Sequence, residues 1–165
     1  MTRLNSVYGG GASLMAAAML ALALGLAAAP PSAHAQGGDA TILDAREALR
    51  AKDGARLALD RAAAAAERNP LAMWVDYWEL SNRIGEVQQD EVNAFESRWS
   101  GTYVEDRFRN DWLLELGRRE DWANFAAEFP RFRMNDDREV TCYGLLVDHL
   151  NGKDVGDDAL AAWLA

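Results

Sequence analysis

Apolar residues recur at spacings of three and four along most of the chain, and this pattern predicts an all-α protein. Beyond residue 36, no segment alternates apolar and polar residues for long enough to indicate a strand. Four one-sided stripes each predict an amphipathic helix that buries a single face. They are Val92, Phe95 and Trp99; Val104, Phe108, Trp112 and Leu116; Trp122, Phe125, Ala126 and Phe129; and Val140, Tyr143, Val147 and Leu150.

The segment 70–85 has a different pattern, because it is apolar around most of its circumference. Only Asp76, Glu79 and Arg83 form a narrow polar stripe. A helix of this kind must be covered by neighbours on more than one side. We therefore expect this helix to lie inside the fold.

Residues that begin or end helices divide the pattern into short units. They are Asn69 as a cap before Pro70, Gly101 in a left-handed conformation, Thr102 with Glu105 as a capping box, and Gly117 and Phe129-Pro130 as helix ends. Helix pairs then recur at intervals of roughly 30 to 40 residues, as in α-solenoids. We predict a TPR-like α-superhelix of antiparallel helix pairs, in which Ala62–Ala66 form a close-packing face.

The first 35 residues have the features of a secretory signal peptide. Arg3 precedes the apolar run 14–29, and Ala33-His34-Ala35 is a small-residue cleavage site. A retained membrane anchor is the alternative, but the run is shorter than the roughly 20 residues that cross a bilayer. We predict cleavage after Ala35, a mature protein spanning residues 36–165 in the periplasm, and no stable membrane insertion after cleavage.

The charge balance limits the classes of partner. The chain carries 17 basic and 26 acidic residues, a net charge of −9. Nucleic acids and anionic membrane surfaces are bound mainly through Lys and Arg. We therefore predict that neither is a partner.

The carboxylates and histidine do not form a recognisable catalytic or metal site in the sequence. The densest acidic clusters are Asp136-Asp137 and the group Asp154, Asp157 and Asp158, and neither has the spacing of a calcium loop. We interpret them as solvated loop charges, and we place most carboxylates of the chain on solvent-facing surfaces. His149 is the only histidine after cleavage, and a position near a helix C-terminus explains it. No catalytic, cofactor-binding or metal-ligating residue is predicted, and no cofactor is expected.

Cys142 is the single cysteine, and it allows two interpretations. It would act as a nucleophile only with a base, and His149 lies seven positions away. A structural thiol, or one half of a disulfide with a partner outside this chain, is the interpretation we favour.

Six tryptophans are many for a chain of this length. Sugars stack on aromatic rings, so a glycan platform is one interpretation. Five of the six lie on apolar stripes, which favours helix-on-helix packing. Trp163 belongs to a final apolar segment, 157–165, that has no helix-ending residue.

Several strings, in this order and spacing, resemble the superhelical domain of soluble lytic murein transglycosylases. The resemblance covers about residues 40–165. Its strings are Asn69-Pro70-Leu71-Ala72 followed by Trp74 to Leu80; Val92-x-x-Phe95 with Arg98 to Thr102; Asp106-Arg107; Trp112-Leu113-x-x-Leu116; Asp121-Trp122-x-x-Phe125; Phe129-Pro130; Glu139 to Tyr143; and Ala162-Trp163-Leu164.

The resemblance implies a U-shaped or ring-like superhelix that leads into a lysozyme-like domain. Members of the family cleave the β-1,4 bond between N-acetylmuramic acid and N-acetylglucosamine and release 1,6-anhydro products. One glutamate acts first as acid and then as base, because the muramoyl 6-hydroxyl replaces the attacking water. No position here matches that motif, so we expect the catalytic domain to be absent from this chain and the chain alone to be inactive. The implied partners are peptidoglycan glycan strands.

The resemblance also implies a role for Cys142. In the family a cysteine follows the Trp-Leu helix by a short segment, so Cys142 is expected to form half of a disulfide. Two other functions stay open on the residues alone. One is an exported TPR-like adaptor without enzymatic activity, and the other is a small periplasmic ligand-binding protein, although no pocket-forming polar group stands out.

Overall fold

The computed structural model describes the backbone of residues 33–164 and the side chains of residues 39–164, and this region is all-α. It contains no strand in these residues. Its helices are α1 (Ala33–Ala51), α2 (Gly54–Ala66), α3 (Ala72–Asn82), the 3-10 helix η1 (Ile84–Glu86), α4 (Gln89–Arg98), α5 (Tyr103–Arg118), α6 (Trp122–Glu128), the 3-10 helix η2 (Phe129–Arg131), α7 (Arg138–Leu150) and α8 (Gly156–Leu164). The all-α prediction is confirmed.

The predicted signal peptide lies outside the described residues, except that Ala33–Ala35 begin α1. Cleavage after Ala35 therefore stays a prediction. Between residues 33 and 164, none of the helices is long and apolar enough to cross a membrane.

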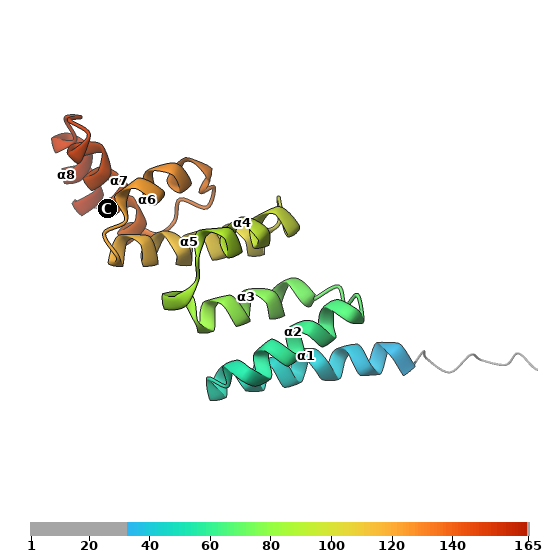
Figure 1. The fold of residues 1–165 in the computed structure, drawn as a ribbon. Helices are drawn as coiled ribbons and strands as arrows, with labels where there is room; N and C mark the ends of the chain where they lie inside the picture. Colours follow the sequence, from blue (N-terminus) through green and yellow to red (C-terminus); the bar gives the residue numbers. More distant parts are fainter. Residues whose placement is uncertain (1–32, 165) are drawn as a thin grey trace, which may run out of the picture. The chain divides into compact units, whose positions relative to one another are not determined.

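The first three helices share a small apolar core. Figure 1 shows α1 and α2 side by side and running in opposite directions, with α3 packed against both. Ala45, Ala48 and Ala64 are fully buried beside Leu57 and Val75. Small side chains let the helix backbones approach closely. Ala64 thus confirms part of the predicted packing face, whereas Ala62, Ala65 and Ala66 are exposed.

Helix α3 contributes to two cores, as its broad apolar surface predicts. Val75 belongs to the core of α1–α3, and Leu80 belongs to a second, larger core that extends through α7. The polar stripe of α3 is buried as well, because Asp76 and Glu79 are 3% and 7% exposed. Their charges are met by arginines from the neighbouring segments.

The second core is rich in aromatic side chains from α4, α5 and α6. The Phe95 and Phe108 rings lie 4.7 Å apart between centroids, and Phe125 stacks on Phe129 at 5.4 Å. Trp112 is 1% exposed, and Leu116 is completely buried. The predicted stripe of α5 is therefore the centre of this core.

The predicted helix boundaries are correct in some places and wrong in others. Gly101 has a φ of 79°, as predicted, and Thr102 Oγ1 accepts a hydrogen bond from Glu105 N. The Glu105 carboxylate accepts from Gly101 N, so the capping box is displaced by one residue. Asn69 Oδ1 accepts from Leu71 N, and α3 begins only at Ala72.

Gly117 does not end a helix, contrary to prediction. Helix α5 continues to Arg118, and Glu120 takes the left-handed conformation instead, with a φ of 57°. A Cβ atom on Gly117 would lie 2.4 Å from the ring of Tyr143. The glycine is therefore explained by the close approach of α7 to α5, not by a turn.

Consecutive helices pack against one another from α1 to α3 and from α5 to α8, and α3 also contacts α5. This is the local packing that helix pairs require. The superhelical arrangement itself stays a prediction.

Candidate functional site

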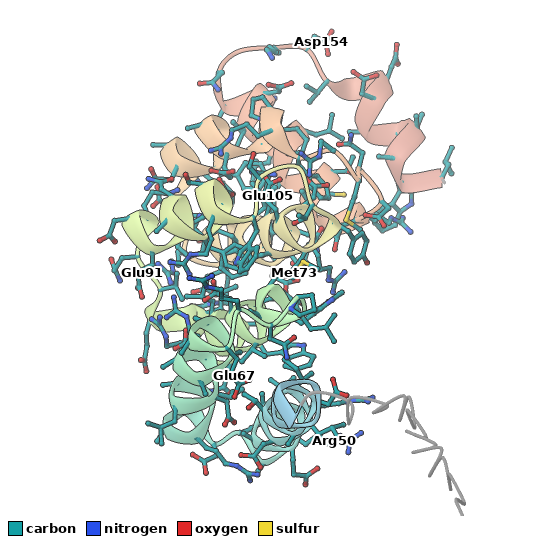
Figure 2. The ribbon with its side chains drawn as sticks, turned by 90° about the vertical axis from the view of Figure 1, so that its right-hand side faces the viewer. Arg50, Glu67, Met73, Glu91, Glu105 and Asp154 are labelled. Carbon is teal, nitrogen blue, oxygen red and sulfur yellow. The ribbon has the colours of Figure 1, made fainter. Side chains whose placement is uncertain are left out.

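A buried cluster of charged side chains surrounds Arg109 on α5. Its guanidinium is 1% exposed. Nε donates to Glu128 Oε1 at 2.7 Å, Nη1 donates to Asp106 Oδ1 at 3.0 Å, and Nη2 donates to Glu105. Glu96 Oε1 lies 3.1 Å from Nη2. One arginine thus connects carboxylates from α4, α5 and α6. Figure 2 labels one of these carboxylates, Glu105.

The side chains of Arg131 and Arg133 cover this cluster on the side that faces solvent. Arg131 of η2 donates to Glu96 Oε2 at 2.5 Å and to Glu128 Oε2 at 3.1 Å. Asp106 accepts hydrogen bonds from the backbone N–H groups of Arg133 and Met134. The segment that follows α6 is therefore fixed to α5 through charged groups. Buried carboxylates of this kind persist only when they are paired and hydrogen-bonded.

Glu96 is the carboxyl group in this cluster whose protonation is most perturbed. Burial, followed by the neighbouring Glu128 carboxylate, raises the pKa of Glu96 to about 7. A carboxylic acid that holds its proton near neutral pH is the kind of group that glycoside cleavage uses as a general acid. However, Glu96 is only 3% exposed and is enclosed by Arg109 and Arg131. It has no route to a substrate, so we assign it to the stability of the fold.

A polar groove of about 740 Å³ lies between α2, α3 and the end of α4. Asp76 forms its floor and accepts from Arg98 Nη1 at 2.6 Å, from Trp99 Nε1 at 2.8 Å and from Arg61. The Asp76 carboxylate is thus fully engaged. Its partners Arg61 and Arg98 are occupied by it in turn, so the groove holds no free catalytic acid or base.

A second, mainly apolar groove of about 530 Å³ lies between α1 and α3. Its lining includes Ile42 and Leu49 of α1 and Trp74 and Trp78 of α3. It contains no carboxylate, histidine or cysteine, so it can bind a ligand but offers no acid–base chemistry.

Cys142 and His149 both line a small hollow of about 220 Å³ between α7 and α8. Cys142 is a free, exposed thiol. Within the described part of the chain, no group of three or more potential metal-ligating side chains comes together. The disulfide implied for Cys142 stays a prediction, because the sequence contains no second cysteine.

The two predicted acidic clusters act at helix ends. Asp137 caps α7 by accepting from Glu139 N and Val140 N, and its other oxygen accepts from Asn110 Nδ2 at 3.1 Å. Asp157 and Asp158 lie in the first turn of α8, where negative charge is favourable for the helix dipole. These positions explain the carboxylates without a bound metal.

The tryptophans divide by exposure. Trp112 is buried, as its stripe predicts, and Trp163 is 74% exposed. The other four tryptophans are half-buried and pack on a core with part of each ring system: Trp74, Trp78, Trp99 and Trp122. The structure therefore supports core packing for Trp112 and leaves aromatic surface available on α3.

Sequence reasoning missed the buried carboxylates. It interpreted most acidic side chains as solvent-exposed, yet Glu96, Glu105, Asp106 and Glu128 are each less than 5% exposed. One signal was present in the sequence: Glu105 and Asp106 precede Arg109 by four and three residues, the spacing of ion pairs on one helix face. The participation of Glu96 from α4 and Glu128 from α6 could not be predicted, because their partner Arg109 lies on another helix.

Comparison of the chain with known protein families, with curated proteins and with solved structures finds no match.

Proposed function

We propose that this chain is the helical arm of an exported lytic murein transglycosylase, an enzyme that cleaves the glycan strands of peptidoglycan to 1,6-anhydromuropeptides. The observation that carries the proposal is the structural role of the residues behind the family resemblance. Asp106 binds Arg109 in the buried cluster, Trp112 fills the second core, and Asp121 caps α6 through Asn124 N. These residues, which carry the family resemblance, therefore hold the helices together.

The distribution of titratable groups supports the role of a scaffold. Among the described residues, Glu96 is the carboxyl group with the most strongly raised pKa, and it is enclosed. The groove between α2, α3 and the end of α4 contains engaged ion pairs, and the groove between α1 and α3 is mainly apolar. In the proposed enzyme, the glutamate that protonates the glycosidic oxygen belongs to a separate domain.

The arm would serve this chemistry by positioning and not by proton transfer. A transglycosylase needs the muramoyl 6-hydroxyl, and not water, to attack the anomeric carbon. Holding a long glycan in one orientation reduces the entropic cost of that intramolecular attack. A scaffold that is rigid across several helices is suited to this task, and the buried Arg109 cluster supplies such rigidity between α4, α5 and α6.

The experiment that tests the proposal uses the natural product of the gene, captured from the periplasmic fraction through a chromosomal tag. It is incubated with purified sacculi in water enriched in oxygen-18, and the released muropeptides are analysed by mass spectrometry. We expect 1,6-anhydro products without the heavy isotope, because no water is added across the bond. Reducing-end products that carry oxygen-18 would indicate a hydrolase. The absence of released products would favour the adaptor interpretation.

A further inference from the structure

Two aromatic side chains of α3, Trp74 and Trp78, line the groove between α1 and α3, and a third, Tyr103, lies next to Trp74 outside the lining. The ring centroid of Trp74 is 6.5 Å from that of Trp78 and 6.2 Å from that of Tyr103, and the ring planes are tilted by 36° and 46°. Trp74 and Trp78 are one helical turn apart on α3, and Tyr103 begins α5. We call these three residues the aromatic row.

The aromatic row packs on the protein with one side only. Trp78 contacts the core of α1–α3, and Trp74 contacts the second core, yet both rings remain partly accessible. Tyr103 is 60% exposed, and Leu43 and Leu71 beside the row are 66% and 42% exposed. Exposed apolar side chains that cluster around an open groove are typical of a binding site.

Two arginines of α1 border the same groove. Arg46 is exposed and has no hydrogen-bond or ion-pair partner among the described residues. Arg50, labelled in Figure 2, contacts only Glu47 at 3.4 Å, and both of these side chains are more than 60% exposed. Such a surface pair is weak and exchanges readily. In a chain with a net charge of −9, this edge therefore offers cationic groups that are free to meet an anion.

We propose that the aromatic row, together with Arg46 and Arg50, binds a glycan strand that carries carboxylate groups. Pyranose rings present flat C–H faces that stack on aromatic rings, and the spacing within the row is comparable to the length of one sugar unit. The arginines complement the lactyl carboxylate of muramic acid. The choice of peptidoglycan as the glycan rests on the proposed function, whereas the preference for an anionic sugar chain rests on this groove.

The groove is separate from any catalytic acid, so its role is to hold the substrate at a distance from the reaction. A second attachment point raises the effective concentration of a glycan for the site to which it is linked. The binding of one or two sugar units should be weak on its own and sensitive to salt, because part of the attraction is between exposed charges.

The test is calorimetric titration of the full chain with two soluble glycans. The first is a preparation of glycan strands freed from their peptides by an amidase, which retain the lactyl carboxylate. The second is a set of N-acetylglucosamine oligomers from chitin, which lack it. We expect saturable binding of both, with weaker binding of the chitin oligomers and a loss of that difference at high salt.

Three variants test whether the aromatic row and Arg46 bind the glycan. Tyr103→Ala should raise the dissociation constant about three- to tenfold for both glycans, the range expected for one aromatic contact. Arg46→Ala should weaken binding of the peptidoglycan strands and leave the chitin oligomers unaffected. Trp163→Ala is the matched control, since it removes an exposed aromatic side chain far along the chain on α8, and it should change neither constant. Thermal melting of each variant verifies that it is folded.

The inference would be overturned if the folded chain bound neither glycan saturably. An apolar peptide would then be the alternative ligand of the groove. Equal effects of Tyr103→Ala and Trp163→Ala, or no effect of Tyr103→Ala and Arg46→Ala, would also overturn the inference. These outcomes are independent of the isotope experiment. If anhydro products are released but the groove binds no glycan, only the inference is wrong. If the groove binds glycan but no anhydro products are released, only the proposed function is wrong.

Discussion

At the scale of single residues, Arg109 has a large expected effect on stability, because it neutralises carboxylates from three helices while its side chain is only 1% exposed. We predict that Arg109→Met lowers the free energy of unfolding by about 3 to 5 kcal/mol, the usual cost of leaving buried charges without their partner. Chemical denaturation monitored by circular dichroism measures this. Arg50→Met is the control: Arg50 also pairs with a glutamate, Glu47, but both side chains are more than 60% exposed, so its loss should change little. Equal losses of stability in the two variants would show that water reaches the charged side chains around Arg109.

The Glu96 carboxyl group predicts how stability depends on pH. Its pKa rises from an ordinary value of 4.5 to about 7 in the folded protein, chiefly because of burial. The folded state therefore holds a proton that the unfolded state releases, and the stability from this group is present below pH 4.5 and is lost as the pH rises toward 7. We predict that wild-type stability falls over this range relative to Glu96→Gln, which stays neutral.

Denaturation curves of both proteins between pH 5 and pH 8 test this dependence. The lower limit avoids the opposite contribution of Glu115, whose pKa is lowered to about 2 by hydrogen bonds from Arg118. Stability from Glu115 is present above pH 4.5 and is lost as the pH falls below it. Parallel curves for wild type and Glu96→Gln would mean that Glu96 is ionised in the folded state.

Gly117 provides a test of close packing between α5 and α7. Its hydrogen faces the Tyr143 ring, and an added Cβ atom would lie 2.4 Å from that ring. We predict that Gly117→Ala destabilises the fold by about 1 to 3 kcal/mol despite the better helix propensity of alanine. Gly85→Ala is the matched control, because its nearest atom would be 4.0 Å away. A melting temperature of Gly117→Ala at or above that of wild type would contradict the close contact.

At the scale of helices, two tryptophans with similar sequence settings differ in burial. Trp112 is 1% exposed in the second core and donates to Gln89 Oε1, whereas Trp122 is half-buried at the start of α6. We predict that Trp112→Ala costs about 3 to 5 kcal/mol and that Trp122→Ala costs clearly less. Calorimetric melting of both variants measures the difference. Similar losses would place the Trp122 indole deeper in the core than the structure has it.

The sequence was sufficient to predict helices wherever one face repeats strongly. The stripe Val104, Phe108, Trp112 and Leu116 is buried along its whole length, and Gly101 has the left-handed conformation expected of it. These features depend on neighbours three or four residues away, which a sequence displays directly.

Features that depend on distant contacts could not be predicted in the same way. Gly117 resembled a helix end because nothing in its own segment reveals the Tyr143 ring, 26 positions later in the chain. Glu96 and Glu128 resembled surface charges because their partner, Arg109, lies on another helix. The groove beside Trp74 likewise needs α1 to be placed against α3. Each of these is a property of tertiary packing, which local patterns do not contain.

At the scale of the whole molecule, the proposed function separates the holding of a substrate from the reaction with it. The described residues supply a set of packed helices and a mainly apolar groove bordered by Arg46 and Arg50, and Glu96, whose pKa is raised to about 7, is buried. The measurement that tests this division most directly is the muropeptide profile of purified sacculi after incubation with the chain alone and, in parallel, with the natural product of its gene. We predict 1,6-anhydromuropeptides from the natural product and none above the no-protein background from the chain. Anhydro products released by the chain alone, or by neither protein, would contradict this prediction.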